Sequence, residues 1–132
     1  MNDALTFSRK ISIIGSLSAG LGVALGAFGA HGLKNSISSE MLTIFETGVR
    51  YQMYHSFALL ATAWAAATLG QGNTFGFKIA AWSFSTGILL FCGSLYLLSI
   101  TGARWLGAVT PLGGVGFLIG WMALAWTLWQ KK

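Results

Sequence analysis

Charge is what this 132-residue chain has least of. Asp, Glu, Lys and Arg together make up only 8% of it, whereas hydrophobic residues make up 55%. A typical soluble domain carries about 25% charged residues. The composition excludes a soluble enzyme, because too little polar surface is present to face water, and it excludes a disordered tail, because the apolar content is too high. The lipid bilayer is therefore the expected solvent.

Cysteine and proline are almost absent, with one residue of each, Cys92 and Pro111. A single cysteine cannot form a disulfide within the chain, which excludes a disulfide scaffold. Cys92 lies in an apolar run and is expected to be a small packing residue. The 18 glycines, accompanied by so little proline, indicate closely packed transmembrane helices rather than flexible linkers.

Acidic residues are also few, so the formal net charge is +5. The basic residues lie singly or in pairs at the ends of apolar runs, which is typical of charges that set membrane topology. They form no continuous basic stripe along which phosphates could bind. The sequence therefore predicts membrane lipid as a partner and no nucleic acid.

Four charge-free apolar segments predict four transmembrane helices. About 20 helical residues cover the roughly 30 Å of a hydrocarbon core, and each segment is long enough. The fold class is thus all-α: an integral membrane four-helix bundle with a short amphipathic segment between the first and second spans. The whole chain, 1–132, is expected to be a single membrane domain. Its approximate spans are 11–31, 51–69, 79–100 and 105–128.

The breaks between these segments differ in character. Residues 70–74 and 101–104 are short and rich in turn-forming residues. The longer connection, 32–50, holds both glutamates, and its residues 38–40 (Ser-Ser-Glu) are typical of a helix start. The apolar residues that follow share one helical face. Two interpretations stay open: a helix lying on the membrane surface, or one that continues directly into the second span.

A secretory signal peptide is the alternative interpretation of the first segment. Its apolar run is about twice the 7–15 residues of a typical signal core, and residues 28–30 fit a cleavage site poorly. We therefore expect an uncleaved first span.

The distribution of basic residues predicts the orientation. With four spans, one side carries Arg9, Lys10, Lys78, Lys131 and Lys132, and the other carries Lys34, Arg50 and Arg104. Cytoplasmic segments are enriched in Lys and Arg, so both termini are expected in the cytoplasm of a bacterium, with the chain in its inner or plasma membrane. Tryptophans near the predicted span ends fit an interfacial belt.

Helix association in lipid needs small residues on the contact faces. The first and fourth segments provide them at four-residue spacing, and the predicted helix-packing residues are Gly22, Gly26, Gly116 and Gly120. On the second segment, Met53, Phe57, Leu60 and Trp64 fall on one arc of a helical wheel, which we expect to face lipid. Pro111 is compatible with a kink in the fourth helix or with a helix that starts later than Trp105.

Ionisable residues are predicted to gather at the non-cytoplasmic end. Tyr51 and His55 are one helical turn apart, as are Glu46 and Arg50, which we expect to pair. The predicted topology brings the end of the first span and the start of the fourth to the same side. The candidate polar site is His31, Glu46, Arg50, Tyr51, His55 and Arg104.

Two interpretations of this polar site stay open. In the first, its members are interfacial residues that cap helices and pair locally. In the second they form a functional pocket, because ionisable groups at membrane depth are costly and tend to mark ligand or proton sites. No third ligand joins the two histidines at a known spacing, so no metal and no cofactor is expected. No catalytic motif is present, and no enzyme is predicted.

Four motifs carry a resemblance to a known family. They are GAFGAHGL at 26–33, GVRYQMYH at 48–55, GSLY at 93–96 and TPLGG at 110–114. In this order they resemble the YgdD/YwdK family of small bacterial membrane proteins, related to the eukaryotic transmembrane protein 256 family, and the similarity extends over about residues 11–126. The resemblance implies a multi-pass inner- or plasma-membrane protein. It implies no catalytic residue, because the family has no established biochemical activity.

Three functional hypotheses remain after these observations. The first is a four-helix membrane protein that binds a lipid or small molecule and is linked to envelope integrity. The alternatives are a small oligomeric transporter or channel, and a structural subunit of a larger membrane complex. The last two imply further copies of the chain or another membrane protein as partners.

Overall fold

The computed structural model describes residues 3–70 and 73–130, and its long elements within these ranges are all helices. The all-α prediction is confirmed for this part of the chain. Gln71 and Gly72 of the predicted second loop, and Lys131 and Lys132 of the charge count, lie outside the described residues.

The described helices form four long rods joined by short connections. The second rod is a single helix, and the first, third and fourth rods each combine segments of different helical geometry. In chain order the elements are α1 (Asp3–Phe28), the π-helical turn η1 (Gly29–Leu33), α2 (Ser39–Leu69), α3 (Phe75–Gly87), the π-helical turn η2 (Ile88–Cys92), α4 (Gly93–Thr101), the 3₁₀ turn η3 (Arg104–Ala108) and α5 (Thr110–Trp129).

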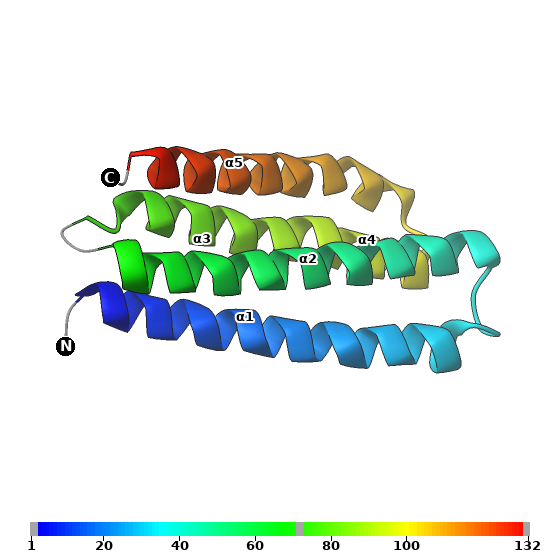
Figure 1. The fold of residues 1–132 in the computed structure, drawn as a ribbon. Coiled ribbons are helices and arrows are strands. Elements are labelled where there is room, and N and C mark those ends of the chain that lie inside the picture. The colour runs from blue at the N-terminus through cyan, green and yellow to red at the C-terminus, as the bar shows by residue number, and fades with distance from the viewer. Residues whose placement is uncertain (1–2, 71–72, 131–132) are drawn as a thin grey trace.

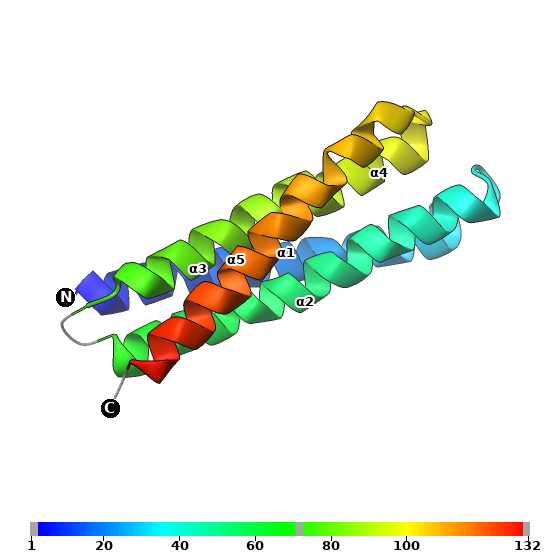
Figure 2. The same ribbon diagram turned by 90° about the horizontal axis from the view of Figure 1, so that it is seen from above.

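The rods are arranged as two antiparallel pairs. The most extensive contacts join α1 to α2 and α3 to α5, and α2 also contacts α3, η2 and α4. Figure 1 shows the four rods side by side, with both ends of the chain at the same end of the molecule. Figure 2 shows that the two pairs diverge towards the opposite end. The second rod is therefore the one that connects the two pairs.

The local sequence explains where the helices begin and end. Ser38 caps α2, because its hydroxyl accepts a hydrogen bond from the Met41 backbone N–H at 3.2 Å, which confirms the predicted helix start. Gly102 ends α4 in the left-handed region, at φ 71°, where glycine has no steric penalty. Pro111 lies in the first turn of α5, so the late start is the interpretation that the structure supports.

The segment before the second predicted span is the first part of α2. The helix runs without interruption from Ser39 to Leu69, so residues 39–50 continue into that span. Their inner face is packed: Phe45 is 1% exposed, and Gly48 lies against the Tyr96 ring. Glu40 and Glu46 are exposed. The segment predicted to lie between two spans is thus helical and continuous with the second span, because it contains no helix-terminating residue.

Three helical segments in the described part of the chain are long and apolar enough to cross a membrane: Asp3–Leu33, Phe75–Thr101 and Arg104–Trp129. They contain the predicted spans 11–31, 79–100 and 105–128. The second rod, α2, has 31 residues and contains 51–69, but it is more polar, since Gln52, His55 and Ser56 lie in its middle.

The predicted packing glycines lie where helices approach one another. A β-carbon on Gly22 would meet the Met53 side chain, and one on Gly26 would touch Val49 at 3.4 Å. On α5, Gly116 approaches the backbone of α3, and Gly120 faces the Phe84 ring. Small residues at these positions allow the close contact that helices in lipid require.

One arc of α2 was predicted to face lipid, but two of its residues pack against α1. Phe57 and Trp64 are exposed, at 57% and 68%, but Leu60 packs against Gly15 and Met53 against Gly22. The prediction was wrong for Met53 and Leu60, because α2 is contacted from more than one side. A helical wheel separates polar from apolar faces and does not reveal a second apolar contact.

Gly113 offers a test of this packing. A β-carbon there would overlap the backbone nitrogen of Phe91, whereas Gly20 has no atom within 4 Å of the corresponding position. We expect Gly113→Ala to lower the free energy of unfolding in detergent by about 1–3 kcal/mol, as overpacking does. Gly20→Ala is the matched control and should leave stability unchanged or raise it by up to about 1 kcal/mol, since alanine favours helix. Equal effects of the two changes in a denaturant titration would contradict the packing described here.

Candidate functional site

The six residues of the predicted polar site lie in two different kinds of environment. Five are exposed, with Tyr51 at 37%: His31 in η1, Glu46, Arg50 and Tyr51 on α2, and Arg104 at the start of η3. Within residues 3–70 and 73–130 the structure shows no ion pair between Glu46 and Arg50. Tyr51 and His55 are together, with ring centroids 6.0 Å apart, and His55 is only 5% exposed.

His55 is held from two sides and by a stacked ring. Its Nδ1 lies 2.7 Å from the carbonyl oxygen of Tyr51, one turn earlier on α2. The indole Nε1–H of Trp121, on α5, donates to His55 Nε2 at 3.2 Å. The Phe117 ring stacks on the imidazole, with centroids 3.4 Å apart and an interplanar angle of 7°. These contacts connect the first helical pair to the second.

The partners of His55 define its tautomer. A carbonyl oxygen only accepts, so Nδ1 carries the proton, and Nε2 is the acceptor for the indole N–H. Both ring nitrogens are occupied in this neutral tautomer. The hydrogen-bonding needs of the His55 ring are therefore met within the protein, and its contacts are those of a packing residue.

A second polar network, centred on Gln52, lies on a neighbouring face of α2. The Tyr96 hydroxyl, from α4, donates to Gln52 Oε1 at 2.8 Å. Gln52 Nε2 donates to the carbonyl oxygen of Ser18, on α1, at 2.9 Å. Ser56 Oγ lies 2.7 Å from both Ser18 Oγ and the Gln52 carbonyl oxygen. The Gln52 network thus joins three of the four rods.

Sequence reasoning did not identify the Gln52 network. Gln52 and Tyr96 belong to the motifs at 48–55 and 93–96, so the resemblance pointed to both positions. A glutamine in the middle of an apolar segment is itself a signal, because a buried amide needs partners. Pairing between residues as far apart as Gln52 and Tyr96 requires the fold, which the sequence pattern did not supply.

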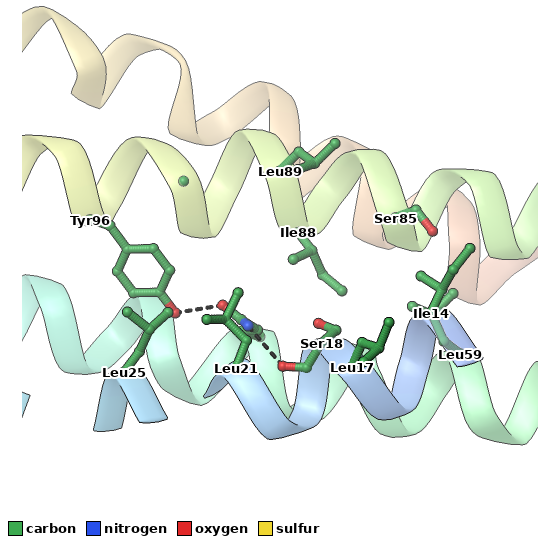
Figure 3. A pocket seen from close by; sticks show the side chains of 12 residues that line it. Ile14, Leu17, Ser18, Leu21, Leu25, Leu59, Ser85, Ile88, Leu89 and Tyr96 are labelled. Carbon is green, nitrogen blue, oxygen red and sulfur yellow. Dashed lines mark hydrogen bonds between the residues drawn. The ribbon is translucent and has the colours of Figure 1, made fainter. Parts of the chain in front are cut away.

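An apolar groove opens above this network, between α1 and the rod formed by α3, η2 and α4. Its volume is about 430 Å³. Figure 3 shows leucine and isoleucine side chains on both walls, with the hydrogen bonds to Ser18 and from Tyr96 at the bottom. Several wall residues are also strongly exposed, among them Leu17 at 70% and Leu89 at 72%, so the groove opens on the outside of the molecule. The residues that line it are Ile14, Leu17, Ser18, Leu21, Leu25, Gln52, Leu59, Ser85, Ile88, Leu89, Gly93 and Tyr96.

The arrangement suits an apolar ligand better than a metal ion. None of the residues that line the groove is charged. In the described part of the chain, no group of three or more His, Cys, Asp or Glu side chains is close enough to hold a metal. A groove with apolar walls and a few polar groups at its base is the usual form of a site for a small apolar molecule.

The contact between His55 and Trp121 has a measurable stability consequence. We expect His55→Phe and Trp121→Phe each to lower the free energy of unfolding in detergent, with a coupling of about 0.5–1 kcal/mol in a double-mutant cycle, as for one hydrogen bond between helices. Trp64→Phe is the matched control, because Trp64 is exposed on the same helix as His55. Strictly additive changes for His55 and Trp121 would show that the bond contributes nothing.

Comparisons with known proteins agree with the sequence resemblance. A family model described as "Protein of unknown function (DUF423)" matches residues 25–114. The UPF0382 membrane protein YwdK of Bacillus subtilis is 48% identical over 113 residues, which cover 85% of this chain and 89% of that protein. A UPF0382 membrane protein of Haemophilus influenzae is 42% identical over 124 residues, 94% and 97% of the two chains.

A third relative, a UPF0382 membrane protein of Staphylococcus saprophyticus, is 43% identical over 112 residues, 85% of this chain and 90% of that protein. No solved structure matches the chain. The names of the relatives and the apolar helices both support a membrane location. The predicted resemblance is confirmed, and the chain belongs to the DUF423 family, whose relatives named here are the UPF0382 membrane proteins.

Proposed function

We propose that the chain is a four-span helical bundle of the bacterial inner or plasma membrane that binds a lipid, or a lipid-like small molecule, in the groove between α1 and the α3–α4 rod. The observation that carries this proposal is the groove itself, about 430 Å³ in volume and lined mainly by leucine and isoleucine. In the cell, this binding serves the integrity of the cell envelope. The protein acts in it as a binding protein and not as an enzyme.

The position and the walls of the groove support lipid as its occupant. Exposed apolar residues such as Leu17, Leu21 and Leu89 surround its opening, so in a bilayer it faces the hydrocarbon. The π-helical turn η2 supplies Ile88 and Leu89 to one wall, and π-helical turns are frequent at functional sites. The opening on the outside of the molecule favours binding over passage through the chain. The transporter, channel and subunit hypotheses have no comparable observation in their favour.

The α2 helix supports the four-span arrangement despite its polarity. Backbone and side-chain polar groups in hydrocarbon need partners within the protein. Gln52, His55 and Ser56 are all buried and hydrogen-bonded to other rods or to α2 itself. The 31 residues of α2 reach about 46 Å, which exceeds the hydrocarbon core, so its first turns with Glu40 and Glu46 extend into the interface as an amphipathic end.

Charge favours an orientation with both termini in the cytoplasm. Arg9 and Lys10 near the start of α1 and Lys78 near the start of α3 share one end of the molecule, whereas Lys34 and Arg104 lie at the other. The enrichment of Lys and Arg on the cytoplasmic side supports this assignment. Exposed tryptophans lie towards both ends, with Trp129 at the first and Trp105 at the second, as interfacial residues do.

Gly93 provides a direct test of binding in the groove. It lines the groove, and a β-carbon there would meet no atom within 4 Å, so a larger side chain can be attached at this position without a clash at its first carbon. We expect Gly93→Phe to reduce the lipid retained by the protein at least several-fold in native mass spectrometry after mild detergent extraction. Gly20→Phe is the matched control, because Gly20 is equally unhindered and lies outside the groove. Equal lipid retention by the two variants would refute the proposal.

The topology is tested by reporter fusions. A reporter that is active only in the cytoplasm should be active after Lys132 and inactive when inserted in the connection at 34–37, because three of the four spans lie between these two positions. The complementary reporter, active only outside the cytoplasm, is the control for expression. The same compartment for both positions would rule out the arrangement of four spans.

A further inference from the structure

The base of the groove keeps hydrogen-bonding capacity that the protein does not use. Gln52 Nε2 carries two protons, and one is donated to the Ser18 carbonyl oxygen at 2.9 Å. Among the described residues no acceptor is present for the other. The Tyr96 hydroxyl donates its single proton to Gln52 Oε1, so its oxygen still has lone pairs to accept a bond. A free donor and a free acceptor thus lie together in a groove whose only other polar side chains are those of Ser18 and Ser85.

The assignment of the Gln52 amide is fixed by its partners. The Ser18 carbonyl oxygen only accepts, so the atom that faces it is the amide nitrogen. The Tyr96 hydroxyl then faces the amide oxygen. These two partners determine the orientation of the Gln52 amide, so the free donor does not depend on a choice between two orientations.

The Gln52 network takes its members from different places along the helices. Ser18 is at the midpoint of the rod Asp3–Leu33, whereas Tyr96 is five residues before the end of the rod Phe75–Thr101. Gln52 follows the exposed Arg50 by two residues on α2. Only the antiparallel packing of the rods brings these side chains to one level.

No residue that lines the groove is charged. A phosphate or carboxylate ligand there would have no cation to pair with, and a buried unpaired charge is strongly unfavourable. A hydroxyl or a carbonyl oxygen, in contrast, accepts one hydrogen bond from the Gln52 amide at little cost. A hydroxyl also donates to the Tyr96 oxygen.

We infer that the groove binds a neutral lipid with one hydrocarbon chain and an oxygen-bearing end group, a hydroxyl or a carbonyl, which the Gln52 amide and the Tyr96 hydroxyl recognise. The leucine and isoleucine walls hold the chain. This inference rests on the proposed function, because it assigns the chemistry of the ligand in the same groove. It explains why an apolar groove is built over a glutamine and a tyrosine.

Two photoreactive probes of equal length test the inference. One is a sixteen-carbon primary alcohol with a diazirine near the hydroxyl, and the other is the alkane with the diazirine at the same carbon. The full-length protein in phosphatidylcholine nanodiscs is labelled with each, and the labelled residues are mapped by mass spectrometry. The exposed α5 residues Leu118 and Met122, which lie outside the groove, report the background at similar depth.

We expect the alcohol to label groove residues at least about five-fold more than the alkane does, relative to the α5 background, as one hydrogen bond at the site implies. Gln52→Met, which keeps the length and removes the amide, should bring the ratio to that of the background. The wild-type ratio decides the question even where this variant folds poorly. A ratio at or below the background overturns the inference.

Gly93→Phe separates this result from a failure of the proposed function. The two probes could label the groove equally, and Gly93→Phe could abolish this labelling. The groove then binds hydrocarbon chains, but the end group is not recognised. Groove labelling that is absent, or unchanged in Gly93→Phe, overturns both proposals.

Discussion

The hydrogen bonds of the Gln52 side chain are the interaction on which the rest of the structure depends. One amide accepts from Tyr96 on α4 and donates to Ser18 on α1, so three rods meet at a single residue. An unmade hydrogen bond inside a membrane costs several kcal/mol, and lipid cannot supply a partner. The polar side of α2 must therefore be covered by the other rods, and its contacts with both pairs follow from its polarity.

The same requirement explains how the two helical pairs are joined. On the side of α2 that faces α5, His55 receives the indole N–H of Trp121 and stacks on Phe117. The Gln52 network makes the connection to α1 and α4. The two pairs diverge away from the end where the termini lie (Figure 2), and the groove lies between α1 and the rod formed by α3, η2 and α4. The groove and the polar network therefore arise from the same arrangement.

Much of the fold follows from composition and from short sequence signals. The helical class, the break at 101–104, the Ser38 cap and the positions of the small residues were all predictable, because each depends on local chemistry or on apolar length. The course of residues 39–50 was not decided by the sequence, since an amphipathic pattern is compatible with a surface helix and with the end of a span. The structure makes them part of α2.

The candidate site was less predictable. Sequence reasoning selected ionisable residues, and of these the structure brings Tyr51 and His55 together while His31, Glu46, Arg50 and Arg104 remain exposed. It passed over Gln52, Ser18 and Tyr96, because neutral polar residues look unremarkable in a charge count. Their pairing joins residues 34 and 44 positions apart, which only the packing of the rods determines. Met53 and Leu60 were misplaced for the same reason.

The contact between the middle of α1 and the polar side of α2 is the central claim, and cysteine cross-linking measures it directly. In a chain with Cys92→Ala, the pair Ser18→Cys and Ser56→Cys should form a disulfide in native membranes, because the two hydroxyl oxygens are 2.7 Å apart. The control pair, Ser16→Cys with Ser56→Cys, should not, since Ser16 is exposed on a different face of α1. A disulfide in the control pair and none between positions 18 and 56 would contradict the buried polar network.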